Sequence, residues 1–442
     1  MQWRPAAFYQ SRRESAFAFQ GDERVKIIVV EPYTKTPGHF EWFAVRTCEA
    51  FHHLKNEVTL VTYGGIETSS LKGPCPFAVV DAAPDGRQDL DVRCHHGKMD
   101  MASLRAFLKK EMQEFRTFRL AASLSRQSGQ RVLHFCAADP VVLEFVLRST
   151  LPGRLQRKDL AILLTVHDAT MLNPAKRIKG KAYRWLYRRR LKKLIQRDLD
   201  GIVVLDPTLK QELINRLTLD TQASERVYVL THGAEHPVNS SSKQEARKRL
   251  KLHPSETVFL VFGILRKDKK IDLAIEAVKE LSKCRLVIAG EAQDYTERDL
   301  MTFIRRHGCE RWVSTEIGYV SERKMDDYFS ACDAVIIPYA RSFKGMSGIL
   351  THACSHGRAV IASDVGILGE TVKKWGIGFA VEPENTMKLR EGICRFLDLT
   401  PEERVEMEQR ASRFARHCSW DVVCQEWVAL YHRLLNQQRM SP

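Results

Sequence analysis

Short runs of aliphatic and β-branched residues alternate with longer amphipathic stretches along most of the chain. The first run, VKIIVV at 25–30, is typical of a buried parallel strand, and the stretch 40–54 after it has helical periodicity. Further runs predict strands at 57–65, 132–137, 160–168 and 200–206. Because strands that alternate with helices form a parallel sheet covered on both faces, this half of the chain predicts a Rossmann-like unit.

The pattern restarts after the polar stretch PVNSSSK at 237–243, which we interpret as the hinge region between two domains. A second doubly wound α/β unit is predicted there, with strands at 258–265, 284–291, 333–339 and 358–364 and the segment VSTEIGYV at 313–320 between them. The tail from 419 is helical by period and is expected to cross back onto the first domain. We therefore expect an N-terminal extension at 1–23, domains at 24–236 and 237–418, and a crossing helix at 419–442.

The composition is that of a globular protein, with 44% hydrophobic and 28% charged residues, and no apolar run reaches the roughly 18 residues of a membrane span. The start of the chain lacks the apolar segment of a secretory signal, so we expect a cytoplasmic protein. Its 11 cysteines are scattered and form no CxxC pair, which favours buried reduced thiols over disulfides or a zinc site.

The net charge of +15 indicates an anionic partner. Much of the excess lies at 176–197, a stretch without acidic residues in which Tyr183, Trp185 and several leucines recur, so it predicts a basic amphipathic helix. Two interpretations stay open for it: peripheral docking on the anionic inner face of a membrane, or packing of its apolar side on the first domain. Nucleic acid is not expected as a partner, because no known readout motif accompanies the charge.

Two segments at predicted strand ends are suited to bind anions. Arg266 and Lys269 lie between a strand and a helix, where backbone amides also favour negative charge, although a solvated turn is the alternative. The second segment, with Ser347 as a cap and Gly348 allowing close backbone approach, opens another helix, and a plain capped helix start is its alternative. Since both segments end strands of one predicted sheet, they are expected to converge on one diphosphate. The second segment comprises Lys344, Gly345, Met346, Ser347 and Gly348.

Over about 25–435 the chain resembles the GT-B glycosyltransferases, in particular the large, mostly retaining group that includes glycogen synthases and bacterial polysaccharide enzymes. The segments FGILRKDKKIDLAIEAV, LVIAGE and SWDVVCQEW, and the long run from DAVIIPY to GILGE, support this resemblance. It implies two Rossmann-like domains facing a central cleft. It also implies a nucleotide-diphosphate sugar donor in the C-terminal half and a glycan or lipid-linked acceptor in the N-terminal half. Retention is implied, with neither metal nor a further cofactor.

The resemblance also implies residue roles. Arg266 and Lys269 are expected to neutralise the leaving diphosphate, and Gly263 and the amides of Ser347 and Gly348 to lie against the donor. For His167 a core histidine is the alternative reading, and Glu41 and Asp139 are either acceptor-site groups or ordinary carboxylates. Near the sugar and the cleft, the resemblance places His167, Asp168, Gly38, His39, His232 and Gly233.

One departure from the family pattern concerns the second anion segment. The family commonly has two glutamates eight residues apart there, and this chain has Lys344 and His352 instead. Some subgroups keep a Ser-Gly pair without the glutamates, and this chain resembles them. The alternatives are a nucleotide-sugar epimerase and a non-catalytic nucleotide-sugar-binding subunit. The DxD spelling at Asp89 and Asp91 lies in a polar loop, and we interpret it as coincidental.

Overall fold

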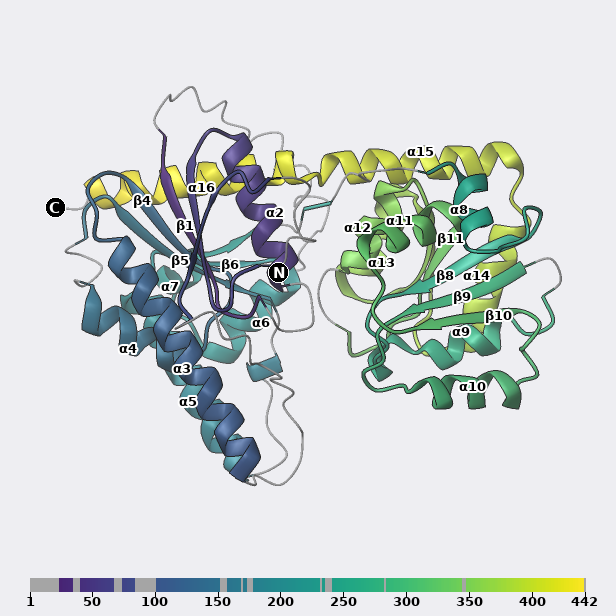
Figure 1. Cartoon of the computed structure of the whole chain (residues 1–442), viewed down its shortest axis with the longest axis horizontal. Coiled ribbons are helices and arrows are strands. Elements are labelled where there is room, and N and C mark those ends of the chain that lie inside the picture. The colour runs from purple at the N-terminus through teal and green to yellow at the C-terminus, as the bar shows by residue number, and fades with distance from the viewer. Residues whose placement is uncertain are drawn as a thin grey trace. The chain divides into compact units, whose positions relative to one another are not determined.

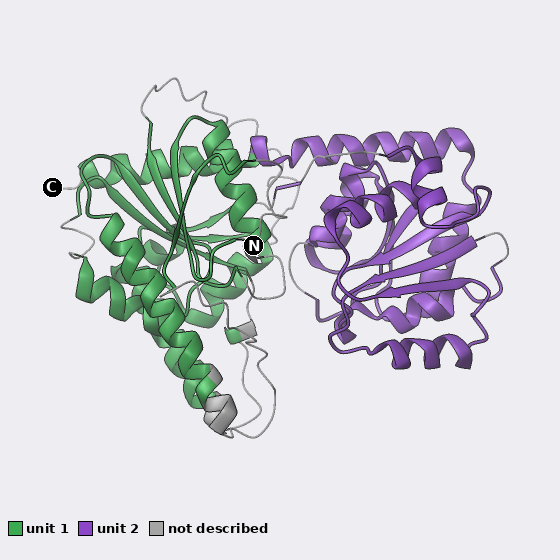
Figure 2. Ribbon diagram, viewed as in Figure 1, with its two compact units in different colours: residues 1–231, 423–442 green, residues 232–422 purple. Residues whose placement is uncertain are grey.

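The chain forms two compact units in a computed structural model (Figure 2): Met1–Thr231 with Val423–Pro442, and His232–Val422. Each unit is built on its own parallel sheet and is described by itself. The structure describes residues 24–34, 40–66, 74–83, 101–151, 157–167, 170–172, 178–230, 233–234, 241–281, 284–343 and 347–440.

The N-terminal unit contains a seven-stranded parallel sheet with the order β3-β2-β1-β4-β5-β6-β7 (Figure 1). Its central strands are almost wholly buried, which explains their continuous apolar sequences. The strands are β1 (Lys26–Glu31), β2 (Glu57–Thr62), β3 (Ala78–Asp81), β4 (Arg131–Phe135), β5 (Leu160–Val166), β6 (Gly201–Val204) and β7 (Val227–Val229).

Helices cover both faces of this sheet. On one face, a core that includes Phe118, Leu143 and Leu194 packs α3, α4 and α5 against alternate residues of the strands. On the other face, Phe51 of α2 meets Trp427 of α16, with ring centroids 6.5 Å apart. The helices are α2 (Phe40–His53), α3 (Met101–Leu124), α4 (Pro140–Thr150), α5 (Ile178–Arg197), α6 (Pro207–Leu217), α7 (Thr221–Glu225), α16 (Trp420–Met440) and the 3₁₀ turn η4 (Thr170–Leu172).

The C-terminal unit contains a six-stranded parallel sheet with the order β10-β9-β8-β11-β12-β13. Every strand pair in it is parallel, as expected for a doubly wound unit. The strands are β8 (Thr257–Phe262), β9 (Cys284–Gly290), β10 (Val313–Ile317), β11 (Ala334–Ile337), β12 (Ala359–Ser363) and β13 (Gly378–Val381).

Two separate hydrophobic cores hold helices on the two faces of this sheet. One core packs α11, α12, α13 and α15 on one face, and the other packs α9, α10 and α14 on the opposite face. The helices are α8 (Lys243–Arg249), α9 (Ile271–Ala277), α10 (Glu297–Arg306), α11 (Glu322–Ala331), α12 (Gly348–Ser355), α13 (Gly366–Trp375), α14 (Thr386–Leu397), α15 (Pro401–His417) and the 3₁₀ turn η5 (Lys267–Lys269).

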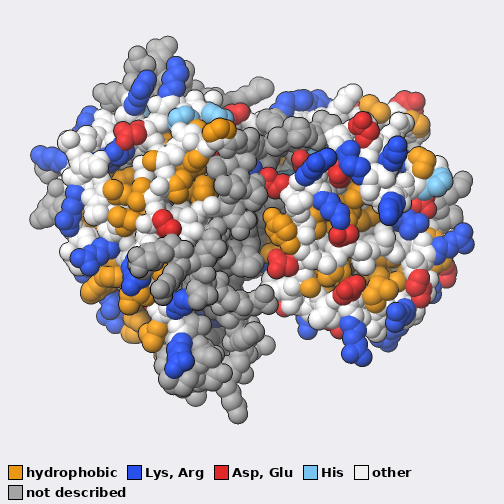
Figure 3. Space-filling view, viewed as in Figure 1, with side chains coloured by type: hydrophobic (Ala, Val, Ile, Leu, Met, Phe, Trp, Pro, Cys, Tyr) orange, Lys and Arg blue, Asp and Glu red, His pale blue; other side chains and the backbone are white. Residues whose placement is uncertain are grey.

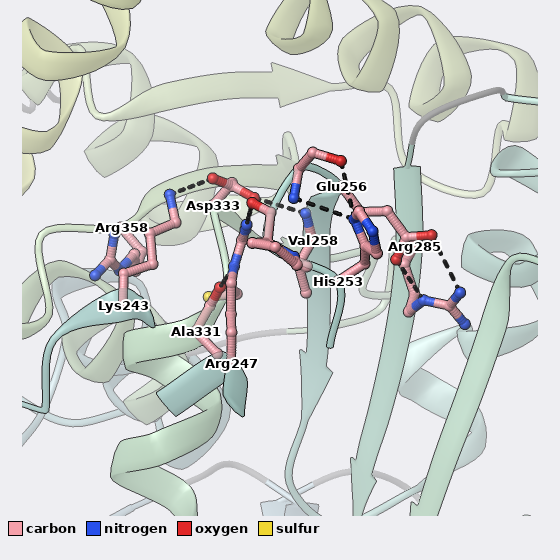
Figure 4. A network of polar contacts seen from close by, with 12 residues as sticks. Lys243, Arg247, His253, Glu256, Val258, Arg285, Ala331, Asp333 and Arg358 are labelled. Carbon is pink, nitrogen blue, oxygen red and sulfur yellow. Dashed lines mark hydrogen bonds and ion pairs between the residues drawn. The ribbon is translucent and has the colours of Figure 1, made fainter. Parts of the chain in front are cut away.

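Asp333, just before β11, anchors the first helix of this unit at the amino edge of the sheet (Figure 4). Its carboxylate accepts from the Arg247 guanidinium at 2.7 Å and the Val258 amide at 2.6 Å, and it pairs with Lys243. The guanidinium also donates to the carbonyl of Ala331 at 3.0 Å. Because the opposite edge of a doubly wound sheet is the one that binds ligands, we assign this network to stability.

The structure confirms the predicted strands in both halves, with ends that differ by a few residues. It also contains β3, β7 and β13, which the sequence pattern missed because each is short and consists mostly of half-buried or exposed residues. Of the polar stretch that we interpret as the hinge region, residues 237–240 lie outside the described part of the chain. No helix in the described part of the chain has the length and apolarity needed to cross a membrane.

Candidate functional site

The order of the C-terminal sheet reverses between β8 and β11, which are neighbours in the sheet but not in the chain. In open α/β sheets, ligands bind outside the carboxyl ends of the strands at such a switch point. The segments that follow these two strands include Gly263 to Lys269 and Tyr339 to Ser347. The two segments that the sequence predicts as anion sites therefore begin at the same place in the fold.

Gly263 and Lys269 lie against each other directly after β8. Gly263 has φ +102°, and a Cβ on it would lie 3.0 Å from the Lys269 ammonium nitrogen and 3.4 Å from Cδ1 of Ile349. A side chain here would therefore strain the backbone and press on the ammonium group. The missing side chain of Gly263 lets Lys269 reach the sheet edge beside α12.

The Lys269 ammonium, unlike the Arg266 guanidinium, has no carboxylate partner among the described residues. Burial, followed by repulsion from Arg266, lowers its pKa to about 8. It lies 5.9 Å from the ring centre of Tyr339, and its ammonium forms no hydrogen bond or ion pair among the described residues. A partly desolvated cation without a carboxylate is stabilised when an anion binds beside it.

Arg266, in contrast, already has an anionic partner. Its Nε and Nη2 donate to the two carboxylate oxygens of Asp268 at 2.9 and 2.7 Å. Both side chains are partly exposed, at 39% and 37%, so water screens the pair. The guanidinium can therefore exchange this carboxylate for another anion at modest cost.

Backbone contacts hold the loop after β8 in place. The amide of Ala340 donates to the carbonyl of Asp268 at 2.7 Å, which joins the loops after β8 and β11. In the loop that follows the neighbouring strand β9, Asp294 accepts from the amide of Lys267 at 3.1 Å. The cations of this loop therefore project from a backbone tied to both neighbouring strand ends.

Ser347 immediately precedes α12 but does not cap it with its side chain. Its hydroxyl lies 3.2 Å from the hydroxyl of Tyr339 instead, and burial raises the pKa of that tyrosine to about 12. A Cβ on Gly348 would have no described atom within 4 Å, so the helix start is open at this point. The first amides of α12 are thus oriented to favour an anion.

His352, one turn into α12, packs against an aromatic ring. Its imidazole is stacked on Phe329 of α11, with the ring centres 5.7 Å apart. The side chain is half-buried. This packing fixes the ring next to the helix, and its predicted role in donor binding stays a prediction.

In the N-terminal unit the sheet order reverses between β1 and β4. His167 follows β5 near this point, and its Nε2 donates to the carbonyl of Cys136 at 2.9 Å. The imidazole also meets Phe43 edge to face, with the ring centres 5.1 Å apart. The structure thus places His167 at the ligand-binding edge, in a fixed orientation.

The other described candidates, Asp139 and Glu41 of the N-terminal unit and Gly233 of the C-terminal unit, have structural contacts. Asp139 is the N-cap of α4, accepts from the amide of Val141 at 2.9 Å and also binds the Tyr183 hydroxyl. Glu41 is buried in the first turn of α2. Gly233 touches Trp420, since a Cβ on it would come within 2.2 Å of the indole.

The remaining predicted residues lie outside the described part of the chain, namely Gly38, His39, Asp168, His232, Lys344, Gly345 and Met346. The DxD spelling at 89–91 lies outside it as well. Among the described residues, no three His, Cys, Asp or Glu side chains gather as a metal site would require. Independence from metal stays a prediction.

Sequence reasoning missed Asp268, Asp294 and Tyr339 as parts of this site. Their signal in the sequence is their place at the end of a predicted strand, for Tyr339, or three residues beyond one, for Asp268 and Asp294. Position and positive charge together pointed to Arg266 and Lys269, whereas a carboxylate inside a basic loop does not suggest an anion site.

The C-terminal unit matches the family model "Glycosyl transferases group 1" over residues 242–414. A glycogen synthase from a Marinomonas species is 23% identical over 240 residues, which are 51% of this chain and 48% of that protein. A D-inositol 3-phosphate glycosyltransferase from Rhodococcus erythropolis is 29% identical over 207 residues, 44% of this chain and 46% of that protein. This chain spans about half of the length of these curated relatives.

Solved structures match nearly the whole chain. A sucrose-phosphate synthase from Thermosynechococcus elongatus covers 94% of this chain and 100% of its own, with a TM-score of 0.69 at 16% identity. Anabaena HepE in complex with UDP and glucose covers 93% of this chain and 100% of its own, with a TM-score of 0.65 at 15% identity. The C-terminal unit thus matches the glycosyl transferases group 1 family, and the chain has the GT-B fold of two Rossmann-like units.

Proposed function

We propose that the protein is a glycosyltransferase that moves a sugar from a nucleotide-diphosphate donor to a glycan or lipid-linked acceptor. The main observation in support is the ammonium of Lys269, which is partly desolvated, unpaired among the described residues and placed at the switch point of the C-terminal sheet. A donor diphosphate would supply the missing anion. UDP in the complex of the structurally similar HepE agrees with a ligand of this class.

The proposed chemistry breaks the bond between the anomeric carbon and the diphosphate oxygen. Negative charge then develops on the diphosphate, where Lys269, Arg266 and the first amides of α12 would stabilise it. The acceptor oxygen forms the new bond on the same face of the sugar, and its proton passes to a diphosphate oxygen. Retention and independence from metal come from the family resemblance, and both belong to this proposal.

His167 is the proposed sugar-facing group of the N-terminal unit. Because a carbonyl can only accept, the hydrogen bond to Cys136 requires a proton on Nε2 of the imidazole. The orientation of the ring is therefore set before any substrate binds. Replacing His167 with Ala is expected to lower turnover more than donor affinity.

The decisive experiment combines nucleotide binding with product analysis. Calorimetric titration with UDP, GDP and ADP identifies the nucleotide, and incubation with the matching nucleotide sugars then reports hydrolysis or transfer. Release of nucleoside diphosphate, abolished by Lys269→Met, supports the transferase. Interconversion of sugar nucleotides without release would establish an epimerase. Binding without turnover would establish a non-catalytic subunit. This outcome would connect the lack of activity to Lys344 and His352, which stand where the family commonly has two glutamates.

A further inference from the structure

Helix α3 of the N-terminal unit presents an exposed face that mixes cations with apolar side chains. Its positions recur at helical spacing, so they share one side of the helix. Neither acidic residue of the helix belongs to this face, since Glu111 is partly buried and Glu114 is buried. The exposed face consists of Arg105, Leu108, Lys109, Met112, Arg116 and Arg119.

The apolar part of this face continues onto α4. Leu108 and Met112 are 56% and 51% exposed, and Phe145 of α4 is 64% exposed. Phe115 connects the two helices, because its ring lies 6.1 Å from that of Phe145. Figure 3 shows hydrophobic side chains beside Lys and Arg over this part of the unit.

This concentration is uneven over the molecule. Of ten exposed large hydrophobic residues in the described chain, five lie on α3, α4 and α5. Three arginines beside them, Arg105, Arg116 and Arg119, make no ion pair with a described residue. Free cations around exposed apolar groups attract an anionic partner with an apolar interior.

Helix α5, in contrast, uses much of its apolar side inside the protein. Leu191, Leu194 and Ile195 are buried in the core of the unit, and Glu144 of α4 pairs with Arg190 and Lys193. Trp185 remains 54% exposed, with the Arg189 guanidinium 5.3 Å from its ring centre. The described part of this helix therefore packs on the core of its unit, and Trp185 is its exposed large hydrophobic side chain.

We propose that Arg105, Leu108, Met112, Arg116, Arg119 and Phe145, here called the α3–α4 surface, dock the protein on an anionic lipid bilayer. The arginines bind lipid headgroups, and the three apolar side chains enter the interface between headgroups and acyl chains. A second copy of the chain is the competing occupant, because Arg, Met and aromatic residues are also enriched at protein interfaces, and the test below separates the two. The proposal concerns binding alone and does not depend on sugar transfer.

The test is sedimentation of the full-length protein with vesicles of phosphatidylcholine alone, or of phosphatidylcholine mixed with phosphatidylglycerol. We expect binding to the mixed vesicles at low salt, little binding to the neutral ones, and release as salt is raised. The triple variant R105Q/R116Q/R119Q should bind the anionic vesicles on the order of a hundredfold more weakly. L108S/M112S/F145S should lose at least about tenfold.

Matched controls lie in the C-terminal unit. R305Q/R311Q/R413Q removes the same number of exposed arginines, and M387S/V405S removes exposed apolar side chains. Both controls should bind vesicles as the natural protein does, and W185S reports separately on α5. Circular dichroism verifies that every variant is folded.

The proposal is overturned if the natural protein does not bind the anionic vesicles, or if it binds the neutral vesicles equally well. If R305Q/R311Q/R413Q loses as much vesicle binding as R105Q/R116Q/R119Q, net charge explains the binding and the proposal is overturned as well. If the surface variants instead turn a dimer into a monomer by light scattering, with vesicle binding unchanged, the surface binds a second copy. Nucleotide titration of the same variants should be unaffected, so failure here is distinguishable from failure of the proposed transferase activity.

Discussion

The hydroxyl of Tyr431 and Nδ1 of His134 lie 2.8 Å apart, although the two residues are 297 positions apart in the chain. Nε2 of the same imidazole lies 2.8 Å from the hydroxyl of Thr165 on β5. All three side chains are buried. A buried chain of hydrogen bonds thus ties the C-terminal helix α16 to two central strands of the N-terminal sheet.

Replacing Tyr431 with Phe should lower the free energy of unfolding of this unit by about 1–3 kcal/mol, because it leaves a buried imidazole nitrogen without a partner. Urea unfolding followed by circular dichroism measures the loss. Tyr63→Phe is the control, since its hydroxyl has no hydrogen bond among the described residues. An unfolding midpoint equal to that of the natural protein would show that the hydrogen bond contributes nothing.

His134 should also make this unit sensitive to mild acid. Burial lowers its pKa from 6.5 to about 3, so the folded state excludes a proton that the unfolded chain binds below pH 6.5. The stability linked to this group is present above pH 6.5 and is lost as the pH falls towards 3. Between pH 7 and pH 5, the natural protein should lose about 2 kcal/mol more than His134→Gln. Parallel pH dependences of the two proteins would contradict the exclusion of the proton.

Lys269→Met should weaken nucleoside-diphosphate binding at least about tenfold, because it removes a charge-assisted contact of roughly 1.5–3 kcal/mol. Isothermal titration calorimetry measures the change. Lys267→Met is the matched control, since this lysine belongs to the same turn but is exposed. Equal effects of the two substitutions would mean that the loop acts only through its net charge.

Proton uptake should accompany nucleotide binding. The pKa of Lys269 is lowered to about 8 by burial in the free protein, and a neighbouring diphosphate would raise it again. At pH 8, binding should therefore take up about half a proton, and the affinity should fall as the pH rises to 9. Calorimetry in buffers of different ionisation enthalpy detects this uptake. It should disappear in Lys269→Met.

Asp268→Asn should strengthen nucleoside-diphosphate binding by up to about fivefold, because an exposed ion pair of this kind is worth up to about 1 kcal/mol. The natural carboxylate holds Arg266 and competes with the phosphate groups for it. In an Arg266→Gln background the gain should vanish, which makes a double-mutant cycle the proper control. A loss of affinity in Asp268→Asn would indicate that Asp268 orients Arg266 for the ligand instead.

The sequence alone determined the class of fold and the place of most strands. Runs such as 25–30 and 132–137 are apolar throughout because both faces of a central parallel strand are buried, so each strand is visible locally. The edge strand β3 escaped this reading, because its four residues are exposed or half-buried. The sequence also identified Arg266, Lys269 and Ser347 by their place after predicted strands.

Only the tertiary structure decided how these residues meet. Pairing of β8 with β11 brings Lys269, Tyr339 and Ser347 together, and no local pattern encodes which strands become neighbours. Nor does the sequence show that Arg266 is already paired with Asp268 while the Lys269 ammonium is unpaired among the described residues. The position of that ammonium depends on the backbone at Gly263, which leaves room for it. The periodicity of apolar residues is a property of residues that are close together in the chain. The electrostatics of a site, in contrast, depends on contacts between distant segments that only folding brings together.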